Sequence, residues 1–243
     1  MSIESKLIEV AENVPKVYKA GYDKGKAEGG GSGDDALKSF WDNYQQWGTR
    51  NNYAYAFAGA GWTNETFKPQ YDLKPTANAM NMFNNSSIQG DLGAYLERCG
   101  VVLDLSGCTN VSSIFSGSKY ITHLPSLDIR KATSAASLFS ACSNLKEIEA
   151  IVVGERNTNG TGWFNSCSSL ESVTFVGDIF ANIDLKQCTK LNRASIEILV
   201  GALSTVKSGG TITLSQTAKE AAFTDDEWKA LTDTKPNWRF TLM

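Results

Sequence analysis

The chain has 243 residues, and its 23 Lys and Arg residues against 26 Asp and Glu residues give a formal net charge of −3 at pH 7. No stretch is a basic block, so the composition gives no sign of nucleic-acid or anionic-lipid binding. Hydrophobic residues make up 42% of the chain, as in ordinary soluble proteins, and no apolar run is long enough to cross a bilayer.

The first residues do not read as a secretory signal. Glu4, Glu9 and Glu12 interrupt the apolar positions, so no continuous apolar core of a signal peptide is present. We therefore expect synthesis in a cytoplasm without a signal peptide, and no membrane insertion.

Residues 1–28 are predicted to form a helix for anchoring or oligomerisation. Its apolar residues follow heptad spacing: Ile3, Leu7, Val10, Val14 and Val17. The β-branched residues Ile3, Val10 and Val17 fall at the d position, which disfavours two strands and favours three or more, so a homotrimeric coiled coil is expected. Pro15 is expected to kink the helix. The alternative is a single amphipathic helix that docks on a partner or on the body of this protein.

Residues 29–33 (GGGSG) are predicted to be a flexible linker. Residues 34–98 then form an aromatic-rich N-terminal cap and a degenerate first repeat, beginning with a helix at about 34–49. Ten of the 25 aromatic residues lie between Phe40 and Tyr71. They either cover the end of a repeat stack or form a platform for sugars. The candidate ligand-binding residues are Trp62, Tyr71, Tyr120 and Trp163.

The centre of the chain repeats itself. Phe115, Phe139 and Phe164 each open the pattern F-x-x-[C/S]-x-x-[L/I]-x-x-[I/L/V], at intervals of 24 and 25 positions. Weaker copies begin at Leu105 and Leu185. A period of 20–29 residues with leucine-like positions is typical of leucine-rich repeats, whose units must stack to bury their apolar faces. The sequence thus predicts an α/β repeat fold, a leucine-rich-repeat solenoid over residues 99–194.

Four of the five cysteines occupy one column of this repeat: Cys108, Cys142, Cys167 and Cys188. We expect this column and the three phenylalanines to form the repeat core, because a small, weakly polar side chain packs well against its copy in the next turn. The alternative is a metal or redox cluster. An odd cysteine count argues against a closed disulfide framework, and no zinc-ligand spacing is present. No metal and no cofactor are therefore expected.

Residues 195–243 are predicted to be the C-terminal cap. The expected elements are helices at 195–204, 219–223 and 225–232, with Thr224 as the N-cap of the last, and strands at 211–214 and 238–242.

No catalytic constellation is apparent. His123 is the sole histidine, so a Ser-His-Asp or Cys-His arrangement would have to use it. It comes one position before a core column, so we expect it on the surface of the repeat. Phosphate-loop, HExxH and EF-hand patterns are absent, and the sequence favours a non-enzymatic protein.

The segment SLDIRKATSAASLFSACSNLKEIE resembles the BspA-type leucine-rich repeats of bacterial and phage surface proteins. Three further segments resemble phage and prophage tail-associated proteins of Gram-positive gut bacteria: SIESKLIEVAENVPKVYKAGYDKGKAEGG, FWDNYQQWGTRNNYAYAFAGAGWTNETFKPQYDLKPT and FTDDEWKALTDTKPNWRFTL. The resemblance covers nearly the whole chain. It implies a virion location at the tail tip or baseplate and multimeric assembly, and it carries no binding residues.

We therefore expect a phage tail-tip or baseplate component that binds host cell-surface carbohydrate or protein through the solenoid. Its other expected partners are itself, as a homotrimer, and further tail or baseplate proteins contacted through the N-terminal helix. The alternatives are a bacterial leucine-rich-repeat surface adhesin and a purely structural tail protein without a ligand. A wall-degrading enzyme is a third class, and a zymogram on host cell walls would reveal it.

Overall fold

The computed structural model describes residues 52–207 and 209–243. The predicted N-terminal helix with Ile3, Leu7, Val10, Val14 and Val17, the linker and the helix at 34–49 lie outside the described residues.

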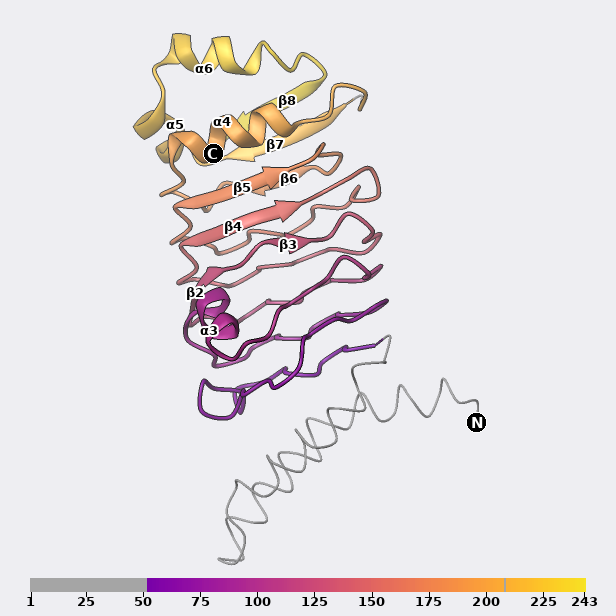
Figure 1. Ribbon diagram of the computed structural model, residues 1–243. Coiled ribbons are helices and arrows are strands. Elements are labelled where there is room, and N and C mark those ends of the chain that lie inside the picture. The colour runs from indigo at the N-terminus through magenta and orange to yellow at the C-terminus, as the bar shows by residue number, and fades with distance from the viewer. Residues whose placement is uncertain (1–51, 208) are drawn as a thin grey trace, which may run out of the picture.

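The described chain winds through successive turns that lie one above another, from the aromatic-rich region to the C-terminus (Figure 1). The rings of Phe115 and Phe139 stack with centroids 6.1 Å apart, and those of Phe139 and Phe164 with centroids 5.5 Å apart. The corresponding ring planes differ by only 10° and 26°. Equivalent positions of the 24- and 25-residue intervals therefore occupy equivalent places in successive turns.

The ring stack continues towards the N-terminus, beyond the region in which the period is readable. Phe83 stacks on Phe115 at 5.3 Å, and Phe57 stacks on Phe83 at 5.3 Å. We call these five rings the phenylalanine column: Phe57, Phe83, Phe115, Phe139 and Phe164. The stacked turns thus begin before residue 99, where the sequence predicts the start of the array. Phe83 and Phe115 are 32 positions apart, and this longer interval contains an additional short helix.

One side of the stack is a parallel sheet built from one strand segment or two per turn. Its strands are β1 (Gly90–Asp91), β2 (Ile121–Leu124), β3 (Leu127–Asp128), β4 (Glu147–Val152) and β5 (Ser172–Val176). Both β2 and β3 pair with β4, and β5 pairs with its other edge. Pro125 lies between β2 and β3, where its missing amide hydrogen interrupts the strand. Strand residues 24 positions apart face each other, as in the pairs His123–Glu147 and Leu127–Ile151.

The opposite side of each turn has no long strands, yet the turns are still hydrogen-bonded to one another. The amides of Ser113, Phe115 and Gly117 donate to carbonyl oxygens of the next turn at 2.8, 3.0 and 2.7 Å. Ser113 and Gly117 have positive φ, at 55° and 75°, as do their equivalents one turn on. In this left-handed conformation, alternate backbone amides point toward the next turn of the stack and donate hydrogen bonds to it. These amides would otherwise be buried without partners.

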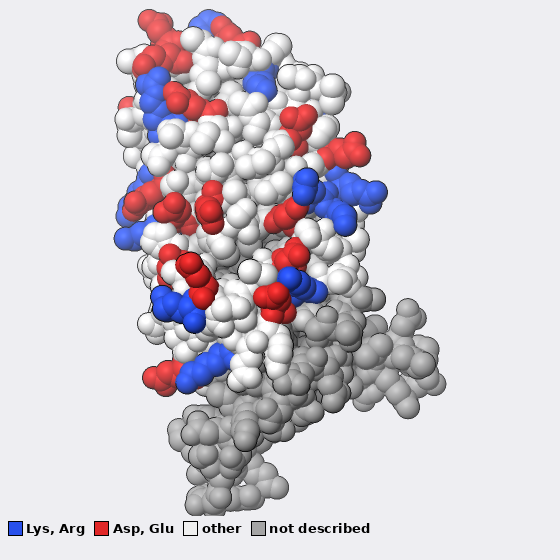
Figure 2. All heavy atoms as spheres, in the orientation of Figure 1, with Lys and Arg blue, Asp and Glu red and all other residues white. Residues whose placement is uncertain are grey.

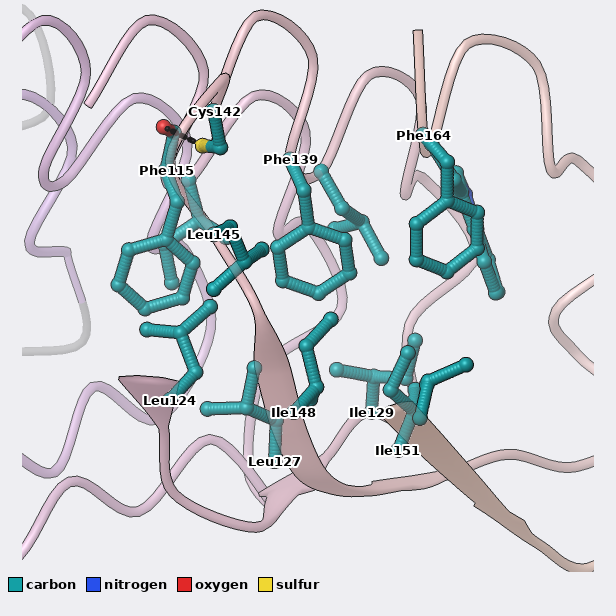
Figure 3. Packing of buried hydrophobic residues seen from close by; sticks show 14 of the residues in the cluster. Phe115, Leu124, Leu127, Ile129, Phe139, Cys142, Leu145, Ile148, Ile151 and Phe164 are labelled. Carbon is teal, nitrogen blue, oxygen red and sulfur yellow. Dashed lines mark hydrogen bonds between the residues drawn. The ribbon is translucent and has the colours of Figure 1, made fainter. Parts of the chain in front are cut away.

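The core runs along the axis of the stack, between the sheet and the phenylalanine column (Figure 3). Cys142, Cys167 and Cys188 are buried beside the phenylalanines in one column, as the repeat predicts, with Ser118 at the equivalent position one turn before Cys142. The prediction is wrong for Cys108, which is also buried but lies elsewhere in the turn, where its thiol donates to the carbonyl oxygen of Pro75 at 3.3 Å. The thiols of Cys142 and Cys167 donate to the carbonyl oxygens of Phe115 and Phe139, at 3.0 and 3.1 Å. Each thiol therefore reaches back to the preceding turn, which is a packing role.

The C-terminal elements agree closely with those predicted. In chain order these are helix α4 (Arg193–Ala202), strand β7 (Gly210–Leu214), helices α5 (Gln216–Ala222) and α6 (Asp225–Thr232), and strand β8 (Trp238–Leu242). Thr224 caps α6 in a capping box with Glu227, as predicted. Strand β6 (Ile183–Leu185) pairs with β7 in a second parallel sheet of order β6-β7-β8.

Helix α4 packs where the sheet would otherwise continue past β5. The amide of Val173 donates to Ser195 Oγ at 2.9 Å, and the amide of Asn192 donates to the carbonyl oxygen of Glu171 at 2.9 Å. These bonds cover part of the open edge of β5, which reduces pairing with other chains. None of the helices within residues 52–207 and 209–243 has the length and apolar character to cross a membrane.

Candidate functional site

The short helix α3 (Leu92–Arg98) stands on the sheet side of the stack, next to β2. Asp91 caps it by accepting a hydrogen bond from the amide of Ala94 at 2.9 Å, and Leu92 and Leu96 are buried beneath it. Tyr95 anchors its middle, because its hydroxyl donates to the carbonyl oxygen of Phe67. The sequence analysis did not predict this helix. The signal for it is a capping Asp followed by apolar residues at spacings of three and four.

A groove lies between α3 and the strands β2 and β4. It consists of two adjoining hollows of about 410 Å³ each, which share Gly93, Glu97, Pro125 and Glu149. We call this feature the α3 groove. Because α3 is capped and β2 pairs with β4, hydrogen bonds hold the backbone in place on both sides of the groove.

One half of the α3 groove is acidic. Its carboxylates come from Asp91, Glu97, Glu147 and Glu149, and neither Lys nor Arg is among the described residues that line it. Glu149 accepts a hydrogen bond from the amide of Ser126 at 3.2 Å. Carboxylates gathered in a hollow produce a negative potential that attracts cationic groups.

His123 lies in this acidic half, on the surface of β2, as expected. Its Nε2 is 3.7 Å from Oε2 of Glu147, and its Nδ1 is 2.9 Å from Oγ1 of Thr122. Register brings His123 and Glu147 together, because they are paired residues of β2 and β4. Within the described part of the chain, no three His, Cys, Asp or Glu side chains converge as metal ligands would.

The other half of the α3 groove is apolar. Leu96, Val101 and Val102 line it together with Pro125, and the side chain of Val102 is 51% exposed. The arrangement thus offers carboxylates at one end and aliphatic carbon at the other, a surface suited to a cationic ligand with an apolar part.

The four predicted ligand-binding residues divide into two groups. Tyr71 and Tyr120 are exposed, at 37% and 51%, so their rings are accessible. Trp62 and Trp163 are 2% and 1% exposed, so the prediction is wrong for these two. The ring of Trp62 packs on Phe57 at 5.2 Å, and that of Trp163 packs on Phe164 at 6.4 Å. Their large apolar rings stabilise the core, and neither can face a ligand.

The exposed residue Tyr120 lies at the margin of the same sheet. Its carbonyl oxygen accepts a hydrogen bond from the amide of Gly90 at 2.9 Å. Gly90 immediately precedes the groove residue Asp91. Tyr120 immediately precedes β2, the strand that carries His123, but it is not among the residues that line the groove.

Charged groups on the face seen in Figure 2 form small clusters separated by uncharged surface, without a continuous basic area. Local ion pairs among the described residues include Asp72 with Lys74 at 2.8 Å and Asp128 with Arg130 at 2.7 Å. This distribution agrees with the balanced composition of the chain.

Burial raises the pKa of the buried thiols above the ordinary value of 9.0, to about 12 for Cys108 and for Cys167. We expect iodoacetamide to label Cys99, which is half-buried, at least about a hundred times faster than Cys142 or Cys167 in the folded protein, because the thiolate is the nucleophile. Labelling at pH 8 followed by mass spectrometry measures the rates, with urea-unfolded protein as the control. Equal rates at Cys99 and Cys142 would contradict a packed cysteine column.

The raised pKa of these buried thiols makes the free energy of unfolding depend on pH. The folded pKa of these thiols lies above the unfolded one, so their contribution is fully present below about pH 9 and is lost as the pH rises toward 12.

In comparisons with known proteins, no family model, no curated protein and no solved structure matches the chain.

Proposed function

We propose that the stacked turns are a leucine-rich-repeat solenoid of the BspA type and that the chain is a non-enzymatic component of a phage tail tip or baseplate. In this proposal the sheet side of the stack binds carbohydrate or protein on the host cell surface. Residues 1–28 join three copies and contact other tail proteins.

The observation that carries the binding proposal is the α3 groove, together with the exposed residue Tyr120 immediately before β2. Ligand sites are typically hollows in which a few polar groups converge beside apolar surface, and the groove has both parts. The scaffold also suits binding, because strands hydrogen-bonded in fixed register hold outward side chains such as His123 and Glu147 in place.

The experiment is binding of fluorescently labelled full-length protein to a panel of Gram-positive gut bacteria. We expect saturable binding to at least one strain. Tyr120→Ala should weaken it about tenfold, as truncation of an aromatic contact residue commonly does. Val206→Ala is the matched control, because Val206 is 81% exposed but follows α4 at the far end of the stack.

Failure of the wild-type protein to bind any strain would contradict host attachment and favour the purely structural tail role. Equal weakening by Tyr120→Ala and Val206→Ala would contradict the placement of the binding surface on the sheet side.

A further inference from the structure

Among the described residues, no Lys or Arg nitrogen lies within 4 Å of the four carboxylates of the α3 groove. Some other described carboxylates do have such a partner: Asp72 is 2.8 Å from Lys74, and Asp184 is 3.0 Å from Lys186. The basic side chain that the described residues place within 4 Å of a groove carboxylate is His123, beside Glu147. The groove therefore gathers carboxylates that no described Lys or Arg pairs with directly.

A complementary segment exists in this chain outside the described residues. Residues 16–26, KVYKAGYDKGK, contain four lysines and one aspartate, Asp23, which gives a net charge of +3 (4 − 1). Val17, Tyr18 and Tyr22 lie between the lysines. We call residues 16–26 the lysine segment. Its charge is opposite to that of the acidic half of the groove, and its apolar side chains suit the half lined by Leu96, Val101 and Val102.

We propose that the lysine segment docks in the α3 groove, with lysine ammonium groups against the groove carboxylates and a tyrosine ring against its apolar half. The groove is then an interaction surface for the chain's own N-terminal region. The proposed host attachment uses the same groove, and Val17 also belongs to the predicted coiled-coil seam, so a copy with a docked segment cannot bind a host ligand in the groove or use Val17 in that seam.

The connecting chain is long enough for docking within one molecule. Asn52 pairs with Asn78, Asn78 with Asn110, and Asn110 with Ser134, one turn at a time. At about 4.8 Å per turn, these three steps span only about 15 Å along the stack. The 26 steps from Lys26 to Asn52 can extend several times that distance. The same length also permits docking on a neighbouring copy.

Docking by charge should depend on salt. Exposed ion pairs are individually weak and are screened at high ionic strength, so occupancy depends on several pairs acting together. Attachment through the chain raises the effective concentration of the segment at the groove, which compensates for weak individual contacts.

The first test is zero-length carbodiimide cross-linking of the full-length protein at low ionic strength, read by mass spectrometry. We expect Lys16, Lys19, Lys24 and Lys26 to be joined preferentially to Glu97, Glu147 and Glu149. Cross-links from these lysines that spread evenly over the other surface carboxylates, or that are absent, would overturn the proposal. In a mixture of ¹⁴N- and ¹⁵N-labelled protein, links within one isotope or between the two both support docking and show which copy supplies the segment.

The second test does not depend on cross-linking chemistry. Trypsin should cleave the lysine segment about fivefold faster in the variant Glu97→Gln/Glu147→Gln/Glu149→Gln than in the wild type, because removing the carboxylate charges releases the segment. A matched variant, Glu155→Gln/Glu171→Gln/Asp178→Asn, removes three exposed carboxylates outside the groove and should cleave like the wild type. Equal cleavage in all three proteins would overturn the proposal. Cell binding can fail while both tests succeed, so the two proposals are separable.

Discussion

Phe139→Ala is expected to lower the free energy of unfolding by about 3–5 kcal/mol, the usual cost of removing a large buried aromatic side chain. Phe139 is fully buried, and its ring stacks between those of Phe115 and Phe164. Its removal leaves a cavity that two neighbouring turns border, and a turn contacts little besides its neighbours. Urea unfolding followed by circular dichroism measures the change.

Two further substitutions serve as references for the loss of unfolding free energy in Phe139→Ala. Phe139→Leu keeps most of the side-chain volume and should cost only about 1.5 kcal/mol. Tyr120→Ala removes an exposed ring and should stay within about 0.5 kcal/mol of the wild type. A loss for Phe139→Ala no larger than that for Tyr120→Ala would show that the phenylalanine column does not stabilise the fold.

Gly177→Ala is expected to destabilise the protein by about 3 kcal/mol or more. Gly177 follows β5 with φ of +91°, a conformation that L residues rarely adopt. A Cβ there would also lie 2.4 Å from the carbonyl oxygen of Val153 in the preceding turn, and a backbone atom cannot rotate away. Thermal unfolding of the variant measures the loss.

Gly201→Ala provides the opposite control. Gly201 lies in α4, and a Cβ there would meet nothing within 4 Å. Because Ala favours the helix over Gly, this change should stabilise the protein by about 0.5–1 kcal/mol. Equal stability of the Gly177→Ala and Gly201→Ala variants would contradict the close approach of the two turns at Gly177.

The features that repeat in the sequence could be predicted because they repeat in space. Phe115, Phe139 and Phe164 share a column since each turn has nearly the same length. Cys142, Cys167 and Cys188 follow from the same register, whereas Cys108 matches the local pattern but lies at a different place in the turn. The elements from α4 to β8 were predictable from local signals, such as Thr224 three residues before Glu227.

What does not repeat could not be predicted in the same way. Helix α3 occurs once, in the long interval between Phe83 and Phe115, so no period marks it, and the α3 groove follows from it. The left-handed backbone at Ser113 is carried by a residue that has no special preference for that conformation. Trp62 and Trp163 were misplaced because composition alone does not distinguish a ring in a core from a ring on a surface.

The described part of the chain is built from stacked turns of about two dozen residues, and changing the number of turns tests this architecture most directly. Duplicating residues 115–138 inserts 24 residues, one whole turn, and keeps the column of Phe115 and Phe139 in register. We expect this protein to unfold cooperatively with stability near that of the wild type, and to be about 5 Å longer by small-angle scattering. Duplicating only residues 115–126 displaces the column by half a turn and should abolish cooperative unfolding. Equal loss of stability in the two insertions would contradict the stack.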